Sequence, residues 1–156
     1  MRRIDREIAD TAEIIKVLER CDTVRIGMRG EEYPYVVPVS FGVEIADGVP
    51  AVYFHCAREG LKVDLLQKDP CVCVEGDVFI KVERTARGIT ARYESVIGFG
   101  RCTLLTDPAE VLHGLRVITD HYDPDFRVES CPGLERLYVG RIALESMTGK
   151  RNLPVV

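Results

Sequence analysis

The residues best suited to chemistry lie in one stretch, Tyr53 to Pro70, which reads YFHCAREGLKVDLLQKDP. An apolar strand delivers His55 to its C-terminal end, a polar turn over 57–60 follows, and Lys62 then stands in the first turn of an amphipathic helix. A helix start presents unpaired backbone N–H groups and the positive end of the helix dipole, which stabilise an anion. Arg58 and Lys62 add full positive charges, so the pattern indicates a phosphate-binding corner. The alternative is an ordinary surface corner with solvated basic residues.

His55 has two interpretations. Its imidazole titrates near neutral pH, so it could donate a proton to a substrate, or it could only hydrogen-bond at the strand end. We favour the catalytic interpretation because His55 adjoins the proposed phosphate turn. His113 and His121, on or near a later helix, are interpreted as structural histidines.

Length and composition favour a single domain over residues 1–156 that buries one core without metals or disulfide bonds. Hydrophobic residues make up 46% of the chain, charged residues 29%, and the net charge is −4, which argues against a nucleic-acid partner. The opening MRRIDREIADTAEII lacks a long uncharged apolar run, so neither a signal peptide nor a membrane span is expected. We therefore expect a cytoplasmic protein with no membrane partner.

The chain has six cysteines, and none has the spacing of a zinc site. In a cytosolic protein they should stay reduced. Cys71 and Cys73 stand two apart in a strand, so we expect them to face the same way and to act as small buried hydrophobes. No metal site is predicted, and a metal–thiolate protein is kept as a minor alternative.

The elements that must position this chemistry are mainly strands. Helix signals occur in three places: a capping-box spacing at Asp10 and Glu13, the short helix after Gly60, and an Asp107–Pro108 start. Proline within the second predicted strand places that segment at an edge or a ligand-facing position. The predicted strands are Thr23–Met28, Tyr35–Ile45, Ala51–His55, Cys71–Gly76, Val78–Glu83, Tyr93–Leu105 and Leu137–Met147, with a polar tail from Thr148.

Most links between these strands are too short for parallel crossovers. The sequence therefore predicts a mainly β fold, an antiparallel barrel of six or seven strands with helices packed outside.

Four stretches carry a resemblance to a known family: MRRIDREI, YPYVVPVSFG, YFHCAREGLKVDLLQKDPCVCVE, and YESVIGFGR at Tyr93–Arg101. In order and spacing the chain resembles the FMN-binding split-barrel flavoproteins related to pyridoxamine 5′-phosphate oxidase. Within them it is most similar to the nitroimidazole-resistance branch. The resemblance covers most of the chain and implies a homodimer with FMN bound between the subunits.

By this resemblance Lys62 binds the FMN phosphate, and His55 points toward the flavin and the substrate. The segment Val37–Phe41 runs along the isoalloxazine ring, and Tyr93 contacts the substrate. A strand with the family pattern YxSVxGxG reaches the same groove from the same or the partner subunit. The predicted cofactor-binding residues are Val37, Pro38, Val39, Ser40, Phe41, Phe54, His55, Cys56, Ala57, Arg58, Leu61, Lys62, Ser95, Val96 and Gly98.

Two departures from the family bear on the substrate. The segment Arg84–Arg92 lacks the aromatic residue that relatives tend to carry there, and the basic residues that would bind a substrate phosphate are not evident. Both argue against vitamin B6 oxidation. The resulting hypothesis is an FMN-dependent oxidoreductase that passes electrons to a nitroaromatic or another small aromatic compound. The alternative is a split barrel that binds flavin or haem without catalysis.

Overall fold

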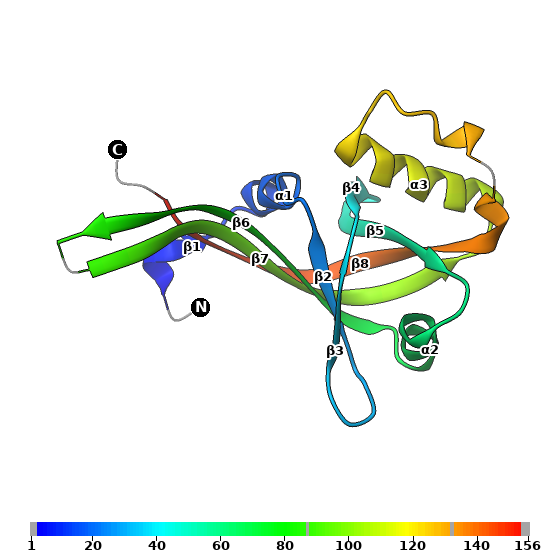
Figure 1. Cartoon of the computed structure of the whole chain (residues 1–156), viewed down its shortest axis with the longest axis horizontal. Helices are drawn as coiled ribbons and strands as arrows, with labels where there is room; N and C mark the ends of the chain where they lie inside the picture. The colour runs from blue at the N-terminus through cyan, green and yellow to red at the C-terminus, as the bar shows by residue number, and fades with distance from the viewer. Residues whose placement is uncertain (1–2, 87, 132, 154–156) are drawn as a thin grey trace.

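The computed structural model describes residues 3–86, 88–131 and 133–153 and shows a large antiparallel sheet with helices packed around it (Figure 1). The strands are β1 (Glu7–Ile8), β2 (Val24–Met28), β3 (Tyr35–Val39), β4 (Gly42–Ala46), β5 (Val49–Ala57), β6 (Cys71–Thr85), β7 (Gly88–Leu105) and β8 (Leu137–Asn152). The α-helices are α1 (Thr11–Leu18), α2 (Leu61–Lys68) and α3 (Pro108–Tyr122), and the 3-10 helices are η1 (Ile4–Arg6), η2 (Val128–Ser130) and η3 (Leu134–Arg136).

The sheet is a barrel that stays open between its two edge strands. Its order is β3-β2-β6-β7-β8-β5-β4, with β1 paired to β8. Only Ser40 and Phe41 join β3 to β4, although these strands stand at opposite ends of the order. Because three Cα steps span at most about 11 Å, the two edges must lie close together. The sheet therefore curls until its edges meet, and within the described residues they do not pair. This arrangement is a split barrel.

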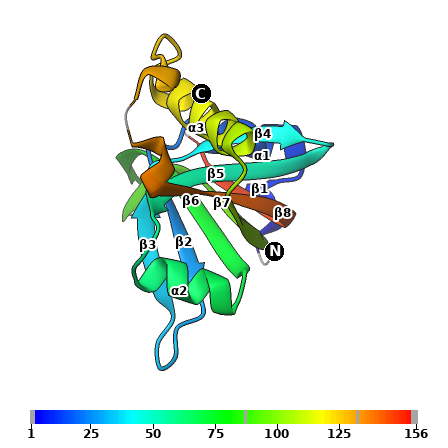
Figure 2. The same cartoon turned by 90° about the vertical axis from the view of Figure 1, so that its right-hand side faces the viewer.

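Two apolar clusters lie on the two faces of the sheet. Residues of β5 alternate between them: Phe54 lies in the barrel interior, and Tyr53 lies in the cluster beneath α3. Figure 2 shows α3 lying across β4, β5 and β8. A Cβ atom at Gly114 of α3 would come within 2.6 Å of Val139, so glycine allows this close packing of helix on sheet.

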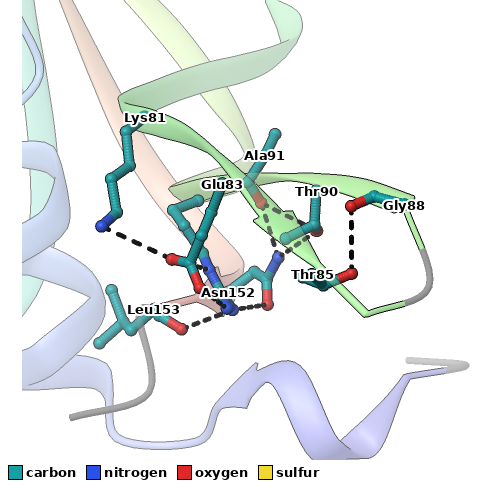
Figure 3. Close-up of polar contacts among 9 residues, drawn as sticks. Lys81, Glu83, Thr85, Gly88, Thr90, Ala91, Asn152 and Leu153 are labelled. Carbon is teal, nitrogen blue, oxygen red and sulfur yellow. Dashed lines mark hydrogen bonds and ion pairs between the residues drawn. The ribbon is translucent and has the colours of Figure 1, made fainter.

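Beyond the barrel, β6 and β7 continue together as a two-stranded arm, at the left of Figure 1. The guanidinium of Arg92, a residue only 8% exposed, donates to both carboxylate oxygens of Glu83 at 2.9 and 3.0 Å and to the carbonyl of Leu153 at 2.8 Å. The Asn152 amide donates to the Ala91 carbonyl at 2.6 Å (Figure 3). These contacts bind the end of β8 to the arm.

The prediction of a mainly β, antiparallel fold with peripheral helices is confirmed, but the strand boundaries differ. The predicted strand Tyr35–Ile45 is two strands, because the chain crosses there from one edge of the barrel to the other. The predicted strands Cys71–Gly76 and Val78–Glu83 are one, β6. Residues 148–152, expected in a tail, belong to β8. This end of β8 pairs with residues 93–97 of β7, where the arm begins.

The expectation that Cys71 and Cys73 are buried is wrong. Cys71 is exposed and Cys73 is half-buried, whereas Val72 and Val74 are 5% and 1% exposed. The larger branched side chains on the alternate face of β6 take the interior positions, so the two thiols point outward.

Candidate functional site

The N-terminus of α2 is open to a ligand. Its N-cap residue, Gly60, has φ 119° and ψ 165°, a backbone region that essentially only glycine adopts, and it offers no side-chain cap. Within the described residues the N–H groups of Leu61 and Lys62 have no hydrogen-bond partner. The first hydrogen bonds of the helix run from the N–H groups of Val63 and Asp64 to the Gly60 carbonyl. A Cβ atom placed on Gly60 would meet nothing within 4 Å. The corner therefore combines free donors with open space.

Lys62 adds a charge to this corner. Its Nζ lies 5.3 Å from the centroid of the buried Phe54 ring. Across the described parts of the chain, Lys62 belongs to none of the ion pairs. Burial raises the pKa of the Cys56 thiol, and the Lys62 charge opposes that rise. The ammonium group is thus available to an external anion.

His55 lies on the other face of β5 from Phe54 and Cys56. It pairs with Val139 and shares its face with Tyr53. Although its side chain is exposed, partial burial lowers the pKa of His55, and the nearby Lys62 charge lowers it further. The imidazole is therefore mostly neutral at pH 7. An anion bound at Lys62 would offset that charge, raise the pKa of His55 and increase the fraction of imidazole that carries a proton.

The predicted ring-contacting segment Val37–Phe41 is only partly accessible. Pro38 and Ser40 are exposed at the edge of the barrel. Phe41 is completely buried, and its backbone N–H donates to the Tyr122 hydroxyl at 3.1 Å. A ligand at this edge can reach side chains at positions 38 and 40 but not the Phe41 ring.

Arg58 turns away from Lys62. Its guanidinium carbon lies 5.2 Å from the Tyr138 ring centroid, and its Nε donates to the Leu137 carbonyl at 3.3 Å. The structure therefore separates the two cations that the sequence placed together. Sequence reasoning missed Tyr138, and no local pattern could have found it, because these partners are about 80 residues apart.

The predicted residues of β7 lie far from the corner within one chain. Leu105 shares a row with Val139 and His55, and Tyr93 lies twelve residues further along β7. At roughly 3.3 Å per residue, this is about 40 Å of strand. Ser95 is half-buried, whereas Val96 and Gly98 point into the barrel. One subunit alone does not bring these residues to Lys62.

The predicted positions therefore fall into three groups. The corner brings together Phe54, Cys56, Leu61 and Lys62, and His55 and Ala57 lie beside it on the other face of β5. The neighbouring barrel edge offers Pro38 and Ser40, with Val37 half-buried and Val39 and Phe41 buried. Arg58 and the β7 residues lie elsewhere.

The donor set fits a phosphate ester with a planar body. Free backbone N–H groups, an unpaired ammonium and glycine-permitted space suit the phosphate. The exposed edge of β3 supplies a wall for the planar part. The fold and this corner define a split-barrel protein with a candidate anion-binding corner between β5 and α2.

A model of the pyridoxamine 5′-phosphate oxidase family matches residues 10–151 of the chain. The chain therefore belongs to this family. A search of curated proteins gives no significant match.

Solved structures of other proteins are also similar to this chain. A proposed 5-nitroimidazole antibiotic resistance protein from Bacteroides thetaiotaomicron is 30% identical, with a TM-score of 0.82 covering 92% of this chain and 85% of that one. The flavocytochrome Anf3 from Azotobacter vinelandii is 20% identical, with a TM-score of 0.81 covering 99% and 72%. An FAD and haem binding protein from Mycobacterium smegmatis is 17% identical, with a TM-score of 0.77 covering 97% and 76%. The last two show a shared fold.

Three further features of the described residues concern metal binding, thiol reactivity and membrane insertion. No group of three or more His, Cys, Asp or Glu residues is arranged to hold a metal ion there. Burial raises the pKa of Cys21 to about 11 and that of Cys102 to about 12, so both thiols are protonated at neutral pH. None of the helices in the described ranges is long and apolar enough to cross a membrane.

Proposed function

We propose that the protein is an FMN-dependent oxidoreductase that reduces small aromatic or nitroaromatic compounds. The observation that carries the proposal is the open α2 N-terminus with the unpaired Lys62, in a chain of the pyridoxamine 5′-phosphate oxidase family. Leu61 and Lys62 would hold the FMN phosphate, and the edge at Pro38 and Ser40 would lie along the ring. Bound flavin would supply the electron-transfer chemistry.

The chain's own residues bind and orient the cofactor and hold a proton. Lys62 anchors the phosphate, and its charge is then partly neutralised. His55, on the opposite face of β5, regains basicity and can carry a proton at its imidazole nitrogen. Nitro reduction consumes protons, and general-acid assistance is typically worth about 10²- to 10⁴-fold in rate.

A homodimer would complete the site. Because Tyr93 and Ser95 lie far along β7, only a second subunit could bring them to the corner. An exposed row on the outer face of the sheet supports such an assembly: Val36 and Phe99, 60% and 54% exposed, lie on either side of Gly27 and Cys73. Phe79 and Ile97 extend this apolar surface along the arm, at 63% and 42% exposure. Exposed apolar patches of this kind mark protein interfaces.

The proposed substrate class rests on two supports. The Bacteroides relative is a proposed nitroimidazole-resistance protein at 30% identity. The corner also offers a single unpaired lysine, enough for the cofactor phosphate but not for a second phosphate on the substrate. The alternative is a non-catalytic flavin or haem binder, supported by the fold shared with a flavocytochrome.

The absorbance spectrum of the purified protein separates these alternatives. Flavin bands in the blue and near ultraviolet support the flavoprotein, and a Soret band supports haem. Chromatography of the released cofactor then distinguishes FMN from FAD.

For the FMN-loaded protein, stopped-flow reoxidation by a nitroimidazole is compared between wild type, His55→Ala and free reduced FMN. We expect wild type to react faster than both. If the protein reacts no faster than free reduced FMN, the oxidoreductase proposal fails.

A further inference from the structure

A cavity lies on the α3 side of the sheet. It has a volume of about 410 Å³, within the range of small-molecule sites. Pro108, Val111 and Leu112 of α3 and Leu134 of η3 form its apolar walls, and Arg58 also lines it. Figure 1 shows the segment after α3 doubling back along this helix, and Glu129, Leu134 and Glu135 of that segment line the cavity.

The charged side chains around this cavity differ in whether they have a partner of opposite charge. Glu129 accepts from Arg116 Nε at 2.6 Å, and Glu135 pairs with Arg136 at 3.4 Å, so both carboxylates have partners. Arg58 has no carboxylate partner among the described residues. The cavity thus has one uncompensated charge, and that charge is positive.

Arg58 is also held in a defined orientation. Its Nε donates to the Leu137 carbonyl, and its guanidinium carbon lies over the Tyr138 ring. In the described residues its two terminal nitrogens have no partner. Two parallel N–H donors match the two oxygens of a carboxylate, and an ordered guanidinium loses less entropy when it binds one.

We propose that this cavity binds a monocarboxylate with an apolar body. The body fills the space between Val111, Leu112 and Leu134, and the carboxylate binds Arg58. A single guanidinium balances one negative charge, whereas a phosphate dianion would leave a net negative charge near Glu129 and Glu135. This site is distinct from the α2 corner, and its assignment does not depend on flavin binding.

The test uses the purified protein with whatever cofactor it carries. Calorimetric titrations compare 4-phenylbutyrate, its neutral amide and 4-phenylbutylamine. We expect the carboxylate to bind about 10-fold or more tighter than the amide, and the amine to bind weakest. Inorganic phosphate should bind more weakly than the carboxylate. Equal affinity for carboxylate and amide, or no saturable carboxylate binding, would overturn the proposal.

Variants test the Arg58 guanidinium and the apolar wall separately. Arg58→Gln should weaken carboxylate binding by about 10- to 100-fold and leave amide binding unchanged. Leu134→Asp should weaken both, because it places a charge in the apolar wall. Arg84→Gln, the same charge change on the distant arm, should alter neither.

FMN affinity is measured on the same variants. If Arg58→Gln weakens FMN binding and not carboxylate binding, Arg58 belongs to the cofactor corner and the proposal is wrong. A thermal melt close to that of wild type confirms that each variant is folded.

Discussion

The N-termini of α2 and α3 face the same physical problem and meet it differently. Asp107 caps α3, accepting from the backbone N–H groups of Ala109 and Glu110 at 2.9 and 3.1 Å. At α2 the cap position is Gly60, which accepts nothing through a side chain, and Lys62 stands unpaired beside it. Both helices begin with free donors. One satisfies them from its own sequence, and the other has no side-chain cap.

A capped and an uncapped helix start differ in what they contribute to stability and to binding. A self-capped helix gains about 1 kcal/mol and presents no binding site. An uncapped helix forgoes that gain and keeps its donors and dipole for an anion. The α1 helix follows the pattern of α3, since Asp10 accepts from Ala12 N at 2.9 Å. Among the three α-helices in the described ranges, only α2 lacks a side-chain cap.

The largest effect is expected for Lys62→Ala, which removes the charge from the open corner. FMN binding should weaken by about 1.5 to 3 kcal/mol, typical of a lost charge-assisted contact, and Lys62→Arg should be milder. Titration of apoprotein with FMN, followed by flavin fluorescence, measures the change. Lys68→Ala, in the last turn of the same helix, is the matched control. Equal affinity for wild type and Lys62→Ala removes Lys62 from the site.

Gly60→Ala tests whether the corner depends on glycine. The φ of 119° strains any L residue, although the added methyl group meets no neighbour. We expect the free energy of unfolding to fall by about 1 to 3 kcal/mol in urea denaturation. Gly48→Ala, at φ 78°, should cost less, about 1 kcal/mol. Similar costs at both positions would argue against a special conformation at Gly60.

Asp107→Ala removes the cap of α3 and should act on stability alone. The free energy of unfolding should fall by about 1 kcal/mol, while FMN affinity stays unchanged. Asp107→Asn retains a capping oxygen and should behave like wild type. Weaker FMN binding in Asp107→Ala would contradict the division between a structural and a functional helix start.

The smallest effect concerns the pKa of His55. Burial and the Lys62 charge hold this pKa below its usual value, so Lys62→Ala should raise it, because one opposing charge is lost. An NMR titration of the imidazole measures the change, with Lys68→Ala as control. A pKa that does not rise in Lys62→Ala would show that Lys62 does not act on His55.

The same shift links to stability. As pH falls, the unfolded chain binds a proton at His55 before the folded chain does. Protonation of His55 therefore lowers the free energy of unfolding, beginning near the ordinary pKa of about 6.5 and continuing down to the lower pKa of the folded state. The loss should be smaller in Lys62→Ala.

Local signals in the sequence predicted the helix starts well. Asp107 before Pro108, and Asp10 before an apolar stripe, act within three residues, and the structure confirms both caps. The glycine-to-lysine turn predicted the α2 corner for the same reason. Strand boundaries were harder to predict, because Ser40 and Phe41 look like strand residues yet carry the chain between the two barrel edges.

The sequence by itself determined the antiparallel fold class and the helix starts, because hydrophobic alternation and caps depend on near neighbours. The resemblance of four stretches to known proteins indicated the family. Tertiary structure alone decided which cation remains at that corner. Arg58 and Lys62 are four residues apart, but Tyr138 and the Leu137 carbonyl, about 80 residues later, hold Arg58 beside another cavity. It also decided that His55 and Lys62 lie on opposite sides of β5 and that Tyr93 is remote from both. Contacts between distant segments set these positions, and they form only when the sheet closes.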